Sequence, residues 1–302
     1  MKEEIISQQE LIFIGTAIVM GSLARILTII QDYRQYPSYP NGYLLNLVSG
    51  IVAAGLGAVV VPAFLSKNYS AITFLTLGIQ HFRDIRKIEN ESLKAVDSSE
   101  YAKRGDAYID GIAKTYEARN YFALLVSFIT EISMYVVNSS IIWVNVLVGV
   151  LAGSITFLIL RRFSKGHNVG DLAEVKIGKI EVRNSELYVD NIFVTNLLGT
   201  DNSRKLVQSE GIGAVICPKK DHFRITLDNY GQRQAILFEV CRRLGVKRYN
   251  FIRKQFSTGK IALAIVPIIR DEGAFIDTIK QTPILENVKK NPELMKSPLE
   301  DK

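Results

Sequence analysis

Four long apolar runs constrain this chain more than any other feature of its sequence. They are residues 11–30, 43–65, 121–137 and 141–160. A helix needs roughly 20 mostly apolar residues to cross the hydrocarbon of a bilayer, and three of the runs reach that length. The second and fourth runs carry no charged residue, whereas helices buried in soluble proteins are usually amphipathic. We therefore predict an integral membrane protein with four spans, in preference to a soluble protein with buried helices.

Charged residues are concentrated outside these runs, which predicts a second, soluble part. The 302 residues carry a formal net charge of +7, a mean hydropathy of +0.14 and 22% charged side chains. These values fit together if apolar residues gather in the first half and charges in the second. The predicted fold class is a membrane protein with a four-helix transmembrane region followed by a small α+β cytoplasmic domain. Its predicted parts are residues 1–65 (first two transmembrane helices), 66–120 (cytoplasmic helical segment), 121–165 (transmembrane hairpin), 166–286 (α+β domain) and 287–302 (disordered tail).

The distribution of basic residues predicts the orientation. The loop at 31–42 contains one arginine and the turn at 138–140 contains none, whereas the segment 66–120 contains nine lysines and arginines. The last apolar run is followed directly by Arg161 and Arg162. Because basic segments stay in the cytoplasm, we expect a multi-pass protein of the cell membrane with cytoplasmic N- and C-termini.

Residues 70–88 show a different apolar pattern, with a spacing of three and four. Its members are Ile72, Leu75, Ile79, Phe82, Ile85 and Ile88. This spacing is typical of one helical face, and we interpret it as a helix along the inner membrane surface. A re-entrant segment is the alternative. Asp97 and Glu100 have the spacing of a capping box that opens a further helix.

Small residues recur on the second apolar run. Ala53 and Gly57 are four residues apart, as are Ala54 and Ala58. Such repeats allow helix backbones to approach closely in lipid. We weigh close packing against another span equally with a helix that is simply rich in small residues.

Two charges interrupt the apolar runs, Arg25 in the first and Glu131 in the third. A charge within a span is costly and usually finds a partner. In the expected orientation both lie roughly 7–9 Å below the outer boundary, at a rise of about 1.5 Å per residue. We hypothesise an ion pair between them. The alternatives are independent snorkelling to the outer headgroups and a proton or ion pathway.

A short motif precedes the third apolar run. Residues 108–113 read YIDGIA, and the next seven read KTYEARN. The positions of interest are Tyr108, Ile109, Asp110, Gly111, Ile112, Ala113, Tyr116, Glu117 and Arg119. Tyrosines at 101, 108 and 116 recur along one helical stripe, which favours internal packing over a partner surface.

The string YIDGIA resembles the signature of the YIEGIA family and differs from it at Asp110, which keeps the carboxylate. The resemblance covers most of the chain. It implies a membrane protein of an endospore-forming bacterium with a role in sporulation and spore envelope assembly. The resemblance implies no catalytic residues.

The C-terminal part reads as alternating strands and helices. We expect strands at 175–182, 187–195, 214–217, 223–227 and 261–269, and helices at 203–210 and 232–244. The strands at 214–217 and 223–227 are expected to pair around the intervening turn. Gly245 is a natural stop for the second helix.

Motifs that carry catalysis are missing from the sequence. It has no nucleophile elbow, no complete phosphate loop and no metal-ligand spacing of Cys and His, so we expect no enzyme activity, cofactor or metal. Cys217 and Cys241 lie among apolar neighbours and are expected to be core thiols.

One basic cluster, interleaved with Tyr249 and Phe251, is the main candidate contact surface of this part. It comprises Lys247, Arg248, Arg253 and Lys254. Lipid headgroups or a protein partner are the favoured ligands over nucleic acid, and a solvated loop is an equal alternative.

The predicted function is that of a non-enzymatic scaffold in spore envelope assembly, which recruits partners at the cytoplasmic face. The expected partners are the lipid bilayer, proteins of the spore envelope machinery and a second copy of the chain, without nucleic acid. The alternative is a small transporter or channel that uses the Arg25/Glu131 pair.

Overall fold

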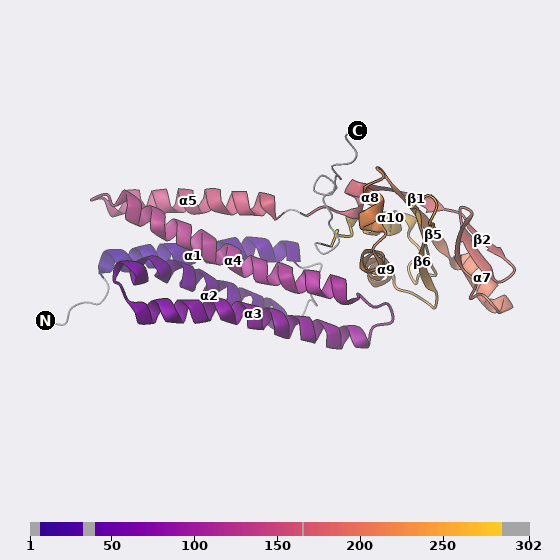
Figure 1. Ribbon diagram of the computed structural model, residues 1–302, viewed down its shortest axis with the longest axis horizontal. Coiled ribbons are helices and arrows are strands. Elements are labelled where there is room, and N and C mark those ends of the chain that lie inside the picture. The colour runs from indigo at the N-terminus through magenta and orange to yellow at the C-terminus, as the bar shows by residue number, and fades with distance from the viewer. Residues whose placement is uncertain (1–6, 33–39, 165, 286–302) are drawn as a thin grey trace, which may run out of the picture. The chain divides into compact units, whose positions relative to one another are not determined.

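The computed structural model describes residues 7–32, 40–164 and 166–285 and contains two compact units (Figure 1). The helical unit comprises Met1–Glu91 and Ile112–Lys165, and the α/β unit comprises Ser92–Gly111 and Gly166–Lys302. The segment 66–120 is therefore divided between the two units. The tail predicted at 287–302 and Arg34 of the first loop lie outside the described residues.

Five long helices supply the described part of the helical unit (Figure 1). They are α1 (Gln8–Asp32), α2 (Pro40–Leu65), α3 (Tyr69–Ser98), α4 (Asp106–Val137) and α5 (Ile142–Phe163). Helix α3 contributes residues up to Glu91 to this unit, and α4 contributes residues from Ile112. Four of the five helices contain stretches long and apolar enough to cross a membrane: Gln8–Ile29, Asn46–Leu65, Asp106–Val137 and Ile142–Phe163. The prediction of four helices with the length and composition of membrane spans is confirmed.

The small residues of α2 lie directly against α4. A Cβ atom added to Gly57 would overlap the carbonyl oxygen of Leu124. The Ser127 hydroxyl donates a 2.7 Å hydrogen bond to the carbonyl oxygen of Ala54. The close packing predicted for the small-residue repeat is thus confirmed, because side chains larger than alanine would separate the two backbones.

Helix α1 runs antiparallel to α4. Near its start, the Phe13 ring packs edge-on against Tyr135 with centroids 5.6 Å apart. Near its finish, the guanidinium of Arg25 lies 5.4 Å from the centre of the Tyr116 ring. The N-terminus of α1 therefore lies beside the C-terminus of α4. We call this end of the helical unit end A.

Helix α5 is also antiparallel to α4. A Cβ atom on Gly149 would lie 2.6 Å from Cγ of Met134, and Arg119 donates to the Ser164 hydroxyl at 2.9 Å. Arg119 is in the first half of α4 and Ser164 follows α5. The finish of α5 therefore lies at the opposite end of the unit, which we call end B.

Helix α3 packs along α2 and α4 and runs antiparallel to both. A Cβ atom on Gly78 would lie 2.8 Å from Cδ1 of Leu56. One turn on, Phe82 is buried with Ala53, Ala54, Ala123 and other side chains of α2 and α4. The helical periodicity predicted for 70–88 is right. Its location along the membrane surface stays a prediction. Helices α2 and α4 bury Phe82 of this face, whereas Ile88 is 62% exposed.

The helix directions limit how the chain can cross a membrane. If α1, α2, α4 and α5 all cross a bilayer, then α3 must return from end A to end B, because α2 finishes at end A and α4 begins at end B. The number of crossings is then odd. The part of the chain before α1 and the part after α5 lie on opposite sides of such a bilayer.

The α/β unit contains two antiparallel sheets. The four-stranded sheet has the order β1-β5-β7-β6 and the three-stranded sheet the order β2-β3-β4. The elements are α6 (Val169–Leu172), β1 (Ala173–Gly178), β2 (Ile180–Arg183), β3 (Glu186–Val189), β4 (Ile192–Thr195), α7 (Asp201–Glu210), β5 (Ile212–Pro218), α8 (Phe223–Leu227), α9 (Tyr230–Leu244), β6 (Asn250–Lys254), β7 (Ile261–Ile265) and α10 (Glu272–Gln281). The predicted small α+β region is confirmed.

Strand β7 is central and buried on both faces. Ile261, Leu263 and Ile265 join the cluster formed with α9 and α10. Ala262 and Ala264 point to the other cluster, which includes residues of β3 and β4. Alternate residues of a strand point to opposite faces of the sheet. The central strand predicted at 261–269 is therefore correct over its first five residues.

The small sheet depends on a tight hairpin that the sequence analysis did not predict. Asp190 and Asn191 have φ values of 46° and 62° and form the two-residue turn between β3 and β4. Asn and Asp tolerate this left-handed conformation, which matches the twist of paired strands. The single strand expected at 187–195 is thus two strands.

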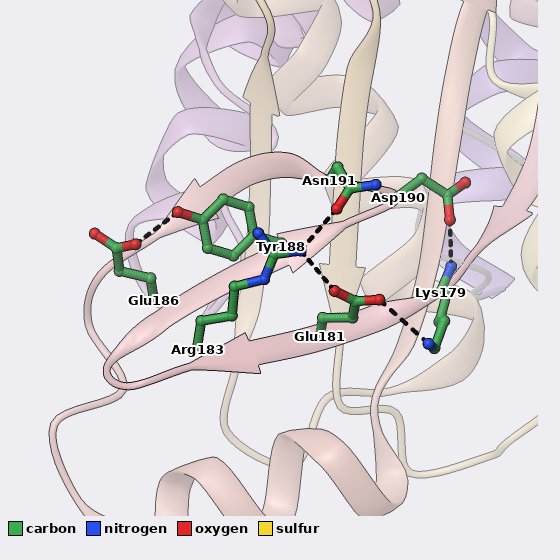
Figure 2. A network of polar contacts seen from close by, with 7 residues as sticks. All are labelled: Lys179, Glu181, Arg183, Glu186, Tyr188, Asp190 and Asn191. Atoms are coloured by element: carbon green, nitrogen blue, oxygen red, sulfur yellow. Dashed lines mark hydrogen bonds and ion pairs between the residues drawn. The ribbon is translucent and has the colours of Figure 1, made fainter.

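Polar side chains brace the exposed edge of this sheet (Figure 2). Arg183 donates to Glu181 at 2.8 Å and to the side-chain oxygen of Asn191 at 2.7 Å. Hydrogen bonds from Arg183 and Lys179 hold the pKa of the Glu181 carboxyl below its ordinary value. The network therefore ties β2 to the turn that follows β3.

Two further local expectations are corrected. Residues 223–227 form the short helix α8 and not a strand, because β5 already pairs with β1 and β7 and offers no free edge. Asp97 does not open a helix. It lies in α3, and its carboxylate accepts hydrogen bonds from the backbone of Arg104 (2.7 Å) and Gly105 (3.3 Å).

The cysteines lie in the α/β unit as free thiols. Cys241 is buried, whereas Cys217 is half-buried. Burial raises the pKa of the Cys241 thiol to about 11, and a hydrogen bond from Asn250 opposes this shift. Cys241 is therefore a core thiol, as predicted.

Candidate functional site

The motif lies near the start of α4, a single helix of 32 residues. Gly105 precedes it with a φ of +85°, a conformation that glycine adopts without strain. Asp106 in the first turn suits the positive end of the helix dipole. The boundary between the two units falls at Gly111 and Ile112, within the motif.

Tyr108 anchors the first half of the motif in the α/β unit. Its hydroxyl donates a 2.6 Å hydrogen bond to Glu239 of α9, and both side chains are buried. Its ring packs edge-on against Phe238 at 6.2 Å. The other oxygen of Glu239 accepts a 2.7 Å hydrogen bond from Arg242. Hydrogen bonds to a charged acceptor are stronger than neutral ones, so this pair stabilises the docking of the motif on α9.

Replacement of Tyr108 by phenylalanine should destabilise the protein by about 1–3 kcal/mol, since one oxygen of buried Glu239 loses its donor. Tyr188→Phe is the matched control, because Tyr188 makes a 2.6 Å hydrogen bond of the same kind to Glu186 in an exposed position. Thermal unfolding of the full-length protein in detergent measures both variants. Equal midpoints for the two would contradict a structural role for the Tyr108 hydroxyl.

The apolar positions of the motif are core residues. Ile109, Ile112 and Ala113 are at most 1% exposed. Asp110 and Gly111 are half-buried. Tyr108 and Tyr116 of the predicted stripe are buried as expected, whereas Tyr101 lies before α4 and is 69% exposed.

Tyr116 anchors the second half of the motif in the helical unit. Its hydroxyl and that of Ser49 are 2.8 Å apart, and Ser49 donates to Asn120 at 3.4 Å. The guanidinium of Arg25 lies over the Tyr116 ring and donates to Asn46 at 3.2 and 3.3 Å. We call these five residues the buried polar cluster.

Glycine makes room for the buried polar cluster. A Cβ atom added to Gly50 would overlap Cγ of Arg25, whose side chain is 1% exposed. Arg25 could be singled out from the sequence, whereas Ser49 and Asn120 could not be assigned to its surroundings. Their spacing in the chain carries no signal, because the cluster is assembled from three helices.

The charged residues that follow Tyr116 bind neighbouring helices. Glu117 accepts from Arg86 of α3 at 3.1 Å and from the Tyr121 hydroxyl at 3.3 Å. Arg119 lies over the Phe122 ring at 5.4 Å and donates to Ser164. The motif and its continuation thus contact α2, α3 and the residue after α5.

The ion pair expected between Arg25 and Glu131 does not form. Arg25 lies beside Tyr116, fifteen residues before Glu131 on α4, which is about 22 Å along a helix. Neither carboxylate oxygen of Glu131 has a hydrogen-bond partner in the structure. The expectation assumed that the first and third spans are parallel, whereas α1 and α4 are antiparallel.

The basic cluster of the α/β unit is dispersed among local partners. Lys247 forms an ion pair with Glu210, and Lys254 lies 2.6 Å from a carboxylate oxygen of Asp228. The guanidinium of Arg253 lies 4.6 Å from the ring centre of Phe193, and that of Arg248 lies 5.5 Å from that of Tyr249. Two of the four charges are therefore offset by carboxylates. A role in lipid or partner contact stays a prediction.

Metal chemistry has no visible basis in the part of the chain that the structure describes. Within residues 7–32, 40–164 and 166–285, no group of three or more His, Cys, Asp or Glu side chains is arranged to hold an ion.

Comparison with known proteins gives the family. Residues 13–295 match the family described as YIEGIA protein. The chain is 33% identical over 282 residues to a Bacillus subtilis (strain 168) protein named "Uncharacterized protein YphB". The aligned region covers 91% of this chain and 92% of the relative. No solved structure matches. The match extends across the apolar helices, the motif and the α/β unit, and the chain belongs to the YIEGIA protein family.

Proposed function

We propose that this protein is a non-enzymatic membrane scaffold of sporulation that recruits partners of the spore envelope machinery. One observation carries the proposal. The motif helix α4 places Tyr108 in the core of the α/β unit and Tyr116 in the core of the helical unit. Each tyrosine thus serves packing within its own unit, which favours a structural role for the motif over a catalytic one.

The proposed location is the cell membrane, with the α/β unit in the cytoplasm. Arg25, Arg119, Arg161 and Arg162 all belong to end B of the helical unit. Positively charged ends stay inside, which supports a cytoplasmic end B. With five crossings by α1 to α5, residues before α1 then lie outside, in place of the cytoplasmic N-terminus expected from the sequence.

Partners are proposed to bind exposed apolar side chains of the α/β unit. Phe256 is 78% exposed and Leu197 is 69% exposed. A photo-crosslinking amino acid at these two positions samples the surface, and the same amino acid at buried Leu263 is the control. Crosslinks from the exposed positions alone, formed during sporulation, would identify the partners or a second copy of the chain.

Deletion of the related gene in Bacillus subtilis tests the role in sporulation. We expect fewer heat-resistant spores from the deletion strain, and recovery when this chain is expressed. Unaltered spore numbers and unaltered spore envelopes in the deletion strain would refute the proposal.

The alternative of a small transporter or channel loses one of its supports, because the Arg25/Glu131 pair does not form. Glu131 remains as a buried ionisable group. Substrate-dependent flux in proteoliposomes, lost on Glu131→Gln, would favour this alternative over the scaffold.

A further inference from the structure

Glu131 is the most unusual side chain of the helical unit. It lies on α4 among the other helices and has no exposed surface. Both of its carboxylate oxygens are without a hydrogen-bond partner. An ionised carboxylate in such surroundings is strongly disfavoured unless a cation or hydrogen-bond donors compensate it.

The groups around Glu131 offer no such compensation. Glu10, at the start of α1, is close enough to repel a charge on Glu131. Tyr135, one turn later on α4, donates its hydroxyl to Glu10 at 3.4 Å. On α5 the Asn145 amide accepts from the backbone N–H of Ser139 at 2.8 Å and donates to its carbonyl oxygen at 2.9 Å, and it makes no hydrogen bond to Glu131.

Within residues 7–32, 40–164 and 166–285, no Lys or Arg side chain hydrogen-bonds to Glu131. Arg25, the cation predicted to pair with Glu131, is buried toward end B, where it contacts Asn46 and Tyr116. Helix α2 contributes Ala58 to the apolar cluster that also contains Phe13 and Met134, and this side chain carries no charge. Since the described part of the chain supplies no cation to Glu131, we infer that a proton neutralises it.

We propose that Glu131, Tyr135 and Glu10 form a proton-binding site at end A of the helical unit, with the proton held on Glu131. Glu10 is partly exposed and lies in the first turn of α1, where the proton would enter the site. The hydroxyl of Tyr135 stands one helical turn from Glu131 and in contact with Glu10. The site goes beyond the scaffold role, which requires no buried acid.

Carbodiimide labelling of the full-length protein in nanodiscs tests the site. Dicyclohexylcarbodiimide is apolar and reacts with protonated carboxyl groups in apolar surroundings. Mass spectrometry of the peptides should locate the label on Glu131 and show less label as the pH is raised. Glu131→Gln should abolish this label, and the exposed, ion-paired Glu181 should stay unlabelled as the internal control.

Two further measurements separate a bound proton from a structural carboxylate. Glu131→Gln should keep the thermal midpoint at or above that of the wild type, because an amide resembles the neutral acid. Glu10→Gln should lower the labelling of Glu131 at neutral pH, since it removes the repelling charge. Absence of label on Glu131 at every pH, or a large fall in the midpoint of Glu131→Gln, would overturn the proposal.

Discussion

Replacement of Gly57 by leucine is expected to remove most of the folded protein from the membrane fraction. The added Cβ atom would overlap the backbone carbonyl of Leu124 and lie 3.1 Å from Cβ of Ser127. Backbone atoms of α4 cannot move aside without separating the two helices. Overpacking of this kind typically costs about 1–3 kcal/mol, and occasionally more. The expected loss is at the upper end, since Ser127 would also lose its hydrogen bond to Ala54.

Gly55→Leu is the matched control on the same helix. A Cβ atom at Gly55 meets no heavy atom within 4 Å. Both variants add the same side chain to α2 and improve its helix propensity equally. The amount of protein in the membrane fraction and its thermal midpoint in detergent should fall for Gly57→Leu alone. Equal behaviour of the two variants would show that α2 and α4 do not approach each other closely.

The two ends of the chain are expected to be reached from opposite sides of the membrane. Ser7 precedes α1 at end A, and Thr258 is an exposed residue of the α/β unit, which follows α5. In a variant without Cys217 and Cys241, Ser7→Cys should react with an impermeant maleimide in intact cells. Thr258→Cys should react only after permeabilisation, because the basic residues of end B favour the cytoplasm.

This result depends on α3 as a fifth crossing. Helix α3 is not among the four helices apolar enough to span a membrane, but from Tyr69 to Phe82 it carries no Asp, Glu, Lys or Arg. The first charges after this stretch, such as Arg86, lie toward end B with Glu117. Protection of both cysteines in intact cells would restore the four-crossing arrangement and contradict the helix directions described above.

Much of the secondary structure could be predicted because it depends on local patterns. Helix α9 ends at Leu244 before Gly245, whose φ of +67° is the conformation that makes glycine a stop signal. The central strand β7 was recognisable as an apolar run of strand length. The errors occurred where a short alternation of apolar residues fits two structures, as in α8. Residues 223–227 form a helix because β5 is already paired on both sides, and a single sequence does not reveal that pairing.

The partners of the motif residues could not be predicted for a related reason. Tyr108 is hydrogen-bonded to Glu239, which is 131 positions away in the chain. Neither spacing nor residue type connects these two positions in a single sequence. The turn at Asp190 and Asn191 is different, because its residue types carried a signal for a left-handed pair that the sequence analysis overlooked.

The amino-acid sequence by itself determined that four helices have the length and apolar content of membrane spans, and that a charged α+β region follows them. Length and hydropathy are local properties, so they can be read without a fold. Only the tertiary structure decided which helices run antiparallel, that α3 joins the bundle, and that Arg25 and Glu131 lie near opposite ends of it. Those features depend on which apolar faces bury each other, and several pairings of the same faces satisfy the sequence pattern equally well.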